Sequence, residues 1–177
     1  MSKENHYIDN DKFFTEMCKW KEQVIEAEEQ GEGRPPVTEY IGECFLKISE
    51  KLSHRPNFVN YPYREEMVSD GIENCLMYAH NFNPEKSKNP FSYFTQMIYY
   101  AFLRRIEREK KQSYVKFKLM EENDDGTFSK WFKENFFDKS FSQKDVADFF
   151  SLSETDIENF DTTKKKKKKK DANSNNK

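Results

Sequence analysis

Residues 88–111 read KNPFSYFTQMIYYAFLRRIEREKK and combine aromatic rings with a run of basic side chains. Asn89 followed by Pro90 is a strong helix start, because asparagine caps free N–H groups and proline suits the first turn. We expect a helix from there to about Lys111 or beyond. One stripe of it is apolar, and comprises Phe91, Phe94, Ile98, Phe102 and Ile106. The second stripe comprises Tyr93, Met97, Tyr100 and Arg104. By periodicity alone, this second stripe either packs on another helix or forms a solvent-exposed binding surface.

Three further helices are expected upstream of this segment. Asp9 or Asn10 caps the first, whose apolar positions are Phe13, Phe14, Met17, Trp20, Val24 and Ile25. Thr38 caps the second, with Ile41, Phe45, Ile48 and Leu52 on one stripe. The third runs from about Arg64 to His80, and its buried side takes Met67, Gly71 or Ile72, Cys75, Leu76 and Ala79. No strand pattern competes with these helices. The sequence therefore predicts an all-α protein with a compact helical domain over residues 10–118.

The rest of the chain has a different composition. Residues 119–163 are acidic and aromatic, and we expect a flexible arm there. Residues 164–177 are a low-complexity, lysine-rich tail that we expect to be disordered. A total of 177 residues fits one domain with such appendages.

The residue types present exclude several classes of function. The three cysteines are Cys18, Cys44 and Cys75; they are far apart and lie among apolar residues, as buried thiols of a reducing compartment do. The chain has no metal-ligand spacing, no glycine-rich phosphate loop and no nucleophile beside a recognisable base. No apolar run reaches transmembrane length. We therefore expect a cytosolic protein that is no enzyme, binds no cofactor or metal and has no membrane partner.

Charge segregation favours a nucleic-acid partner. The formal net charge is only −2, but residues 100–118 hold seven basic and two acidic side chains. Rings interleaved with arginines are typical of single-strand binding, in which rings stack on bases and cations follow the phosphates. The residues we assign to DNA binding are Lys88, Tyr93, Phe94, Met97, Tyr100, Arg104, Arg105 and Arg108.

Residues 66–94 carry an ordered set of short motifs. They are Glu-Met-Val-Ser-Asp-Gly at 66–71, Asn-Phe-Asn-Pro at 81–84 and Phe-Ser-Tyr-Phe at 91–94. This set resembles region two of bacterial sigma factors, and more closely the late-transcription sigma factors of T-even bacteriophages. The likeness covers about residues 10–118.

The resemblance implies a function in transcription initiation inside a bacterial host. It implies that Glu66, Ser69, Asp70 and Glu73 bind a coiled coil of the largest subunit of bacterial core RNA polymerase. It also implies that Phe94 stacks under the flipped adenine of an A/T-rich minus-ten promoter element. The paired tryptophans that wedge the duplex in primary sigma factors correspond here to Met97 and Ile98, so a weaker wedge is expected.

The acidic arm admits three interpretations. Gln143, Val146, Phe149 and Phe150 fit the peptide motif that sliding clamps bind, and the resemblance implies activation by a phage clamp with a late coactivator. Alternatively, Ala147, Leu152, Ile157 and Phe160 have helix-turn-helix spacing, with Ser153 as the cap of an acidic second helix. Plain packing is the third interpretation. Two rival functions also stay open: a stand-alone DNA-binding regulator, and a helical adaptor that only bridges proteins.

Overall fold

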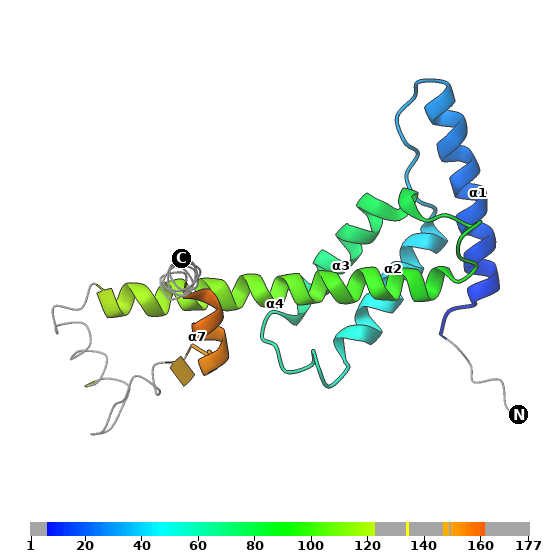
Figure 1. Ribbon diagram of the computed structural model, residues 1–177. Coiled ribbons are helices and arrows are strands. Elements are labelled where there is room, and N and C mark those ends of the chain that lie inside the picture. Colours follow the sequence, from blue (N-terminus) through cyan, green and yellow to red (C-terminus); the bar gives the residue numbers. More distant parts are fainter. Residues whose placement is uncertain (1–6, 123–133, 135–146, 149, 162–177) are drawn as a thin grey trace, which may run out of the picture. The chain divides into compact units, whose positions relative to one another are not determined.

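The computed structural model describes residues 7–122, 134, 147–148 and 150–161 (Figure 1). These residues form helices and connecting turns without any strand, so the predicted all-α class is confirmed for them. The chain divides into two compact units, Met1–Arg105 and Ile106–Lys177. The sequence predicts a boundary near residue 118 instead. None of the helices in the described ranges is long and apolar enough to span a membrane.

The first two helices begin at the predicted caps. α1 (Asn10–Glu29) follows Asp9, whose carboxylate accepts hydrogen bonds from the backbone N–H of Asp11 at 3.0 Å and of Lys12 at 3.1 Å. α2 (Glu39–Ser53) follows Thr38, whose hydroxyl accepts from the backbone N–H of Ile41. Both caps satisfy donors that the helix leaves without intrahelical partners.

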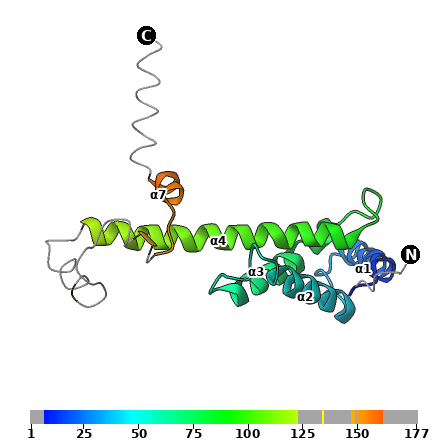
Figure 2. The same cartoon turned by 90° about the horizontal axis from the view of Figure 1, so that it is seen from below.

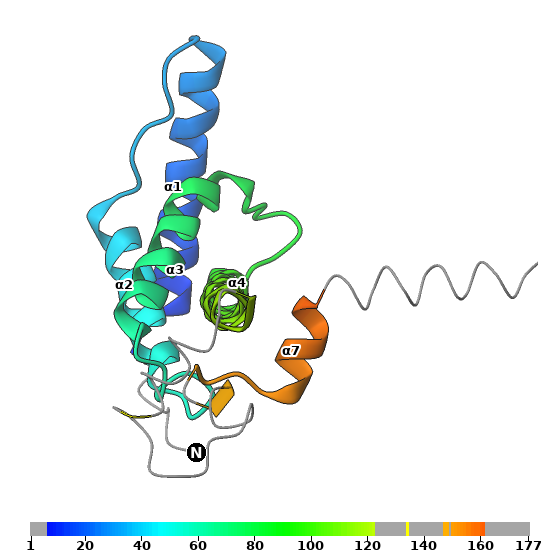
Figure 3. The same cartoon turned by 90° about the vertical axis from the view of Figure 1, so that its left-hand side faces the viewer.

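The third and fourth helices complete the first unit. α3 (Arg64–Tyr78) continues into a short 3-10 turn, η1 (Ala79–Asn81). α4 (Pro90–Glu122) begins after Asn89, whose side chain accepts from the backbone N–H of Ser92 at 2.9 Å, as predicted. Seen from below and along α4, helices α1, α2 and α3 all lie on one side of its amino-terminal half (Figures 2 and 3). One side of α4 therefore faces the core of this unit.

The core of the first unit is built around the ring of Phe94. This ring has no solvent exposure and lies 4.7 Å from the Phe45 ring, 5.7 Å from Phe13 and 5.8 Å from Phe82, measured between centroids. Phenylalanine residues from α1, α2, α4 and the loop before α4 thus meet at one point. Aromatic pairs in such tilted geometry add stabilisation beyond the area that they bury.

Gly71 lets α3 approach its neighbours closely. A Cβ atom at this position would lie 2.6 Å from Oγ of the buried Ser49 on α2 and 2.9 Å from Cγ2 of Ile98 on α4. Such distances are shorter than packed side chains allow. Of the two positions that the sequence left open, Gly71 is the buried one, while Ile72 is half-buried.

Two apolar residues expected on buried stripes are exposed instead. Leu76 on α3 is 46% exposed and Ile25 near the end of α1 is 45% exposed. Leu76 lies five residues after Gly71, so it lies on a different side of α3 from the face that packs on α2 and α4. Ile25 lies one residue beyond Val24, the last buried position of α1.

The second unit contains residues 106–122 of α4 together with a turn and a short helix, α7 (Glu154–Phe160). The backbone N–H of Leu152 donates to the carbonyl of Ala147, and that of Ser151 to the carbonyl of Asp148. Ser151 has a left-handed φ of 54°. This is the Schellman pattern that ends a helix. Ala147 and Leu152 are both buried against Phe117 of α4, so the turn is anchored by its apolar residues.

Candidate nucleic-acid interface

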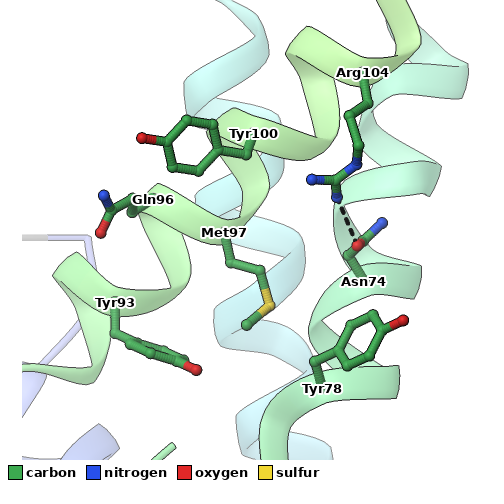
Figure 4. Close-up of a pocket in the computed structure, with 7 residues that line it drawn as sticks. All are labelled: Asn74, Tyr78, Tyr93, Gln96, Met97, Tyr100 and Arg104. Carbon is green, nitrogen blue, oxygen red and sulfur yellow. Dashed lines mark hydrogen bonds between the residues drawn. The ribbon is translucent and has the colours of Figure 1, made fainter. Parts of the chain in front are cut away.

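An open groove of about 580 Å³ lies between α3 and α4 in the first unit (Figure 4). Tyr78 of α3 and Tyr100 of α4 are 43% and 50% exposed, which is high for aromatic side chains. The seven lining residues are Asn74 and Tyr78 from α3, and Tyr93, Gln96, Met97, Tyr100 and Arg104 from α4. The second stripe predicted for residues 88–111 therefore lines a groove between two helices.

The Tyr93 ring of the groove packs on the core beneath it. The Tyr93 ring meets the rings of Phe82 and Phe94 edge to face, at 5.3 and 5.1 Å between centroids. Burial, assisted by the Cys75 thiol group nearby, raises the pKa of Tyr93 above its ordinary value of 10. The Tyr93 hydroxyl therefore keeps its proton at neutral pH and remains a hydrogen-bond donor. The exposed rings of Tyr78 and Tyr100 suit stacking on a nucleobase.

Two adjacent arginines of α4 are bonded to α3. Arg105 donates from Nε and Nη2 to the two carboxylate oxygens of Asp70, each at 2.7 Å. Arg104 donates from Nη2 to the amide oxygen of Asn74 at 2.7 Å, as the dashed line in Figure 4 marks. The Asp70 and Arg105 side chains are 17% and 18% exposed, whereas Arg104 is an exposed residue. The two arginines thus differ in both partner and accessibility.

Two predicted DNA-binding residues need correction. Phe94 is fully buried in the core, so its ring cannot stack under a flipped base in this fold. Arg105 is held by Asp70 in a bidentate ion pair, so its charge is largely neutralised within the protein. The first error arose because the resemblance places an aromatic residue at position 94, whereas the helix geometry turns that position inward.

The other predicted DNA-binding residues are accessible to different degrees. Tyr93, Met97, Tyr100 and Arg104 line the groove together. Lys88 is exposed in the loop before α4 but does not line the groove. Arg108 is exposed and belongs to the second unit.

Three lining residues were absent from the prediction: Asn74, Tyr78 and Gln96. Asn74 and Tyr78 are four residues apart and therefore share one face of α3. A search for polar and aromatic pairs at this spacing would have found them. The sequence did not indicate that this face lies next to α4.

The predicted polymerase-binding residues on α3 are only partly available. Glu66, Ser69 and Glu73 are exposed, which is compatible with a docking surface. Asp70 is the exception, because both of its carboxylate oxygens bind Arg105. Its assignment as a free contact for polymerase is therefore corrected to a structural one, since a carboxylate bound in this way offers little charge to a partner.

The helix-turn-helix interpretation of the arm can be compared with the described residues of the second unit. Ser153 caps α7, and a capping box joins it to Asp156. Ala147, Leu152 and Ile157 belong to one apolar cluster, as that interpretation requires. Phe160 is 5.8 Å from Tyr114 of α4, measured between ring centroids. The turn and the second helix of that hypothesis are therefore present, while most of its first helix lies outside the described ranges.

The sliding-clamp interpretation stays a prediction. Gln143, Val146 and Phe149 lie outside the described residues. Phe150, the remaining residue of the motif, is half-buried and packs against the cluster around Phe117. For Phe150 to enter a clamp pocket, this contact with α4 would have to open.

A salt bridge joins α7 to α4 within the second unit. Lys110 Nζ lies 2.9 Å from Asp156 Oδ2, and Asp156 also accepts from the Ser153 hydroxyl at 2.6 Å. Burial disfavours the charged Asp156, but the hydrogen bonds from Ser153 and Lys110 outweigh it and hold the pKa of this carboxyl below its ordinary 3.8. The carboxylate therefore stabilises the folded unit.

The sign of this pKa shift sets a pH dependence. Because the pKa is lower in the folded state, the contribution of Asp156 is complete above pH 3.8 and disappears as pH falls through the lowered value. We expect a ¹³C NMR titration of the Asp156 carboxyl to show a midpoint below 3.8, with α7 losing order over the same range. In Asp156→Asn, α7 should be less ordered at neutral pH and its order should no longer depend on this titration. A midpoint at or above 3.8 would contradict the bonding described.

The described residues contain no group of three or more metal-ligating side chains, and their cysteines are free thiols. No protein-family model matches the chain, and no curated protein resembles it at a significant level.

Proposed function

We propose that the chain is a sigma factor of the kind that directs late transcription in bacteriophages. In this function it binds bacterial core RNA polymerase and captures one melted strand of an A/T-rich minus-ten-like element. The observation that carries the proposal is the groove between α3 and α4, whose exposed tyrosine rings and exposed Arg104 match the chemistry of single-strand binding. The resemblance of residues 66–94 to sigma region two supports the same function.

The α3 surface supports the polymerase-binding part of the proposal. Glu66, Ser69 and Glu73 are exposed on α3, and acidic side chains suit a basic partner surface. The groove residues Asn74 and Tyr78 lie further along the same helix. In this proposal α3 takes part in both polymerase docking and DNA capture, and the core polymerase carries out the chemistry.

Single-round transcription tests the proposal directly. Bacterial core polymerase is assayed with and without the protein on a supercoiled template that carries an A/T-rich octamer upstream of a start site. Initiation at the octamer that depends on the protein supports the sigma function. Stable binding to core polymerase without initiation would indicate either an adaptor or the need for a coactivator. The absence of both core binding and initiation would refute the proposal.

Tyr100→Ala is expected to weaken promoter opening while binding to core polymerase stays unchanged. The Tyr100 ring is 50% exposed, so its removal costs little stability, but stacking of a base on such a ring contributes roughly 1–3 kcal/mol. We expect a loss of about tenfold or more in open-complex formation, measured by permanganate reactivity of the melted thymines. Tyr7→Ala is the matched control, because Tyr7 is 41% exposed and does not line the groove. If both variants opened the promoter equally well, the groove would not take part in promoter opening.

A stand-alone DNA-binding regulator is the second candidate function. It is favoured by the capped α7 and the Schellman turn before it, which are parts of a helix-turn-helix. It is opposed by the exposed Glu154 and Glu158 on α7, because acidic side chains repel phosphates. Specific binding of the free protein to promoter duplex, measured by gel shift, would favour this candidate over the sigma function.

A further inference from the structure

Two neighbouring arginines of α4 are held by two residues that lie one turn apart on α3. Asp70 accepts two hydrogen bonds from Arg105, both at 2.7 Å. Asn74 accepts one hydrogen bond from Arg104, also at 2.7 Å. The geometry of the two contacts is similar, but the charge of the acceptor is different. One arginine faces a carboxylate and the other faces a neutral amide.

This difference determines which arginine keeps its charge for a ligand. The carboxylate of Asp70 cancels the charge of Arg105, and that pair is largely covered. The amide of Asn74 fixes Arg104 without cancelling its charge. Among the described residues no carboxylate forms an ion pair with Arg104. A guanidinium has five N–H donors, so the contact with Asn74 leaves Arg104 with donors for an anion.

The Asn74 side chain is itself fixed in one orientation. Its amide nitrogen donates to the backbone carbonyl of Asp70 at 2.9 Å, which turns its amide oxygen toward Arg104. The guanidinium is therefore placed at the wall of the groove by a chain of two hydrogen bonds that begins in the α3 backbone. Figure 4 shows Arg104 reaching from α4 across to Asn74, next to the groove that Tyr78, Met97 and Tyr100 line.

We propose that Arg104 is a pre-positioned phosphate anchor and that Asn74 is its positioning residue, which orients the guanidinium while leaving its charge intact. The ligand group is the backbone phosphate next to a base that lies in the groove. This inference rests on the proposed function, because it assumes a single-stranded nucleic acid at this site. Fixing the side chain in advance lowers the entropy that binding would otherwise lose.

A salt series on a single-stranded oligonucleotide tests the proposal. The full-length protein, in complex with bacterial core polymerase, binds a fluorescein-labelled A/T-rich strand, and anisotropy gives the Kd at several salt concentrations. The variants are Arg104→Ala, Asn74→Asp and Asn74→Ala. Asn74→Asp nearly keeps the side-chain volume and the acceptor oxygen but adds a negative charge. Thermal melting of each variant confirms that it is folded.

Arg104→Ala and Asn74→Asp are expected to behave alike. Each removes one effective positive charge, so each should weaken binding about tenfold and flatten the slope of log K against log salt by about 0.7, the value for one phosphate on a single strand. Asn74→Ala leaves the charge in place but releases the side chain, so it should weaken binding about threefold with the slope unchanged. If Asn74 only stabilised the fold, Asn74→Asp would not flatten the salt slope while Asn74→Ala leaves that slope unchanged.

The outcomes separate this inference from the proposed function. If the wild-type complex binds the strand but Asn74→Asp has the same Kd and slope, the anchor is refuted and the sigma function stands. If Asn74→Ala equals the wild type, the positioning by Asn74 is refuted. If the wild-type complex does not bind the strand at all, both the anchor and the DNA-binding part of the proposed function fail. In the free protein, ¹⁵N NMR of the Arg104 Nε–H should show an ordered side chain that Asn74→Ala releases.

Discussion

Phe94→Ala is expected to unfold the first unit rather than to impair promoter opening alone. The Phe94 ring has no solvent exposure and touches three other phenylalanine rings, from α1, α2 and the loop before α4. Truncation of a buried phenylalanine to alanine costs about 3–5 kcal/mol, which approaches the whole stability of a small domain. Urea unfolding followed by circular dichroism measures this loss directly.

A pair of milder variants makes this prediction specific. Phe94→Leu keeps most of the apolar volume, so it should lose clearly less stability than alanine and retain binding to core polymerase. Ile25→Ala removes an apolar side chain that is 45% exposed, and it should change the unfolding free energy little. If Phe94→Ala remained folded and failed only in promoter opening, the ring would have to be a base-stacking residue after all, and the core described above would be wrong at its centre.

Gly71→Val is expected to cost about 3 kcal/mol or more through overpacking, although valine is a better helix former than glycine. The new Cβ would meet Oγ of Ser49 at 2.6 Å and Cγ2 of Ile98 at 2.9 Å, and the two methyl groups would add to the overlap. Ser49 is fully buried and Ile98 is also buried, so neither side chain has free space in which to move. Overpacking of this kind forces helices apart.

Gly42→Ala is the control, because it also replaces a glycine inside a helix but at a position where a Cβ has space. No atom lies within 4 Å of a Cβ built on Gly42, which lies inside α2. Alanine there should stabilise the protein by about 0.5–1 kcal/mol through higher helix propensity. If the packing described is correct, denaturation under one set of conditions shows changes in unfolding free energy of opposite sign for the two variants. Stabilisation by both would indicate that the gain in helix propensity outweighs the close contact at Gly71.

Local signals in the sequence predicted the helices well. Asp9, Thr38 and Asn89 each cap a helix at the predicted position, because capping depends on side chains within three residues of the cap. The buried stripes were predicted from their period, which the helix geometry fixes. Errors appeared at the edges of stripes, as at Ile25 and Leu76, where burial depends on how far a neighbouring helix reaches.

The candidate site was harder to predict because it is formed by two helices. The residues from α4 were found by their aromatic and basic composition, while Asn74 and Tyr78 of α3 were missed. The sequence does not show that Asp70 is paired, because its partner, Arg105, lies 35 positions further along the chain. A charge in a sequence has no visible partner until the fold brings distant residues together. That information lies in tertiary packing rather than in any local pattern.

The left-handed backbone at Ser151 has a consequence for how this protein tolerates sequence change. A serine at a φ of 54° carries local strain that glycine would not, and asparagine would carry less of it. Substitutions to valine, isoleucine or threonine would bring a branched side chain against the following backbone. Among natural variants of this protein, position 151 should therefore be occupied by serine, glycine, asparagine or aspartate. Its neighbour Leu152 should remain apolar because it is buried.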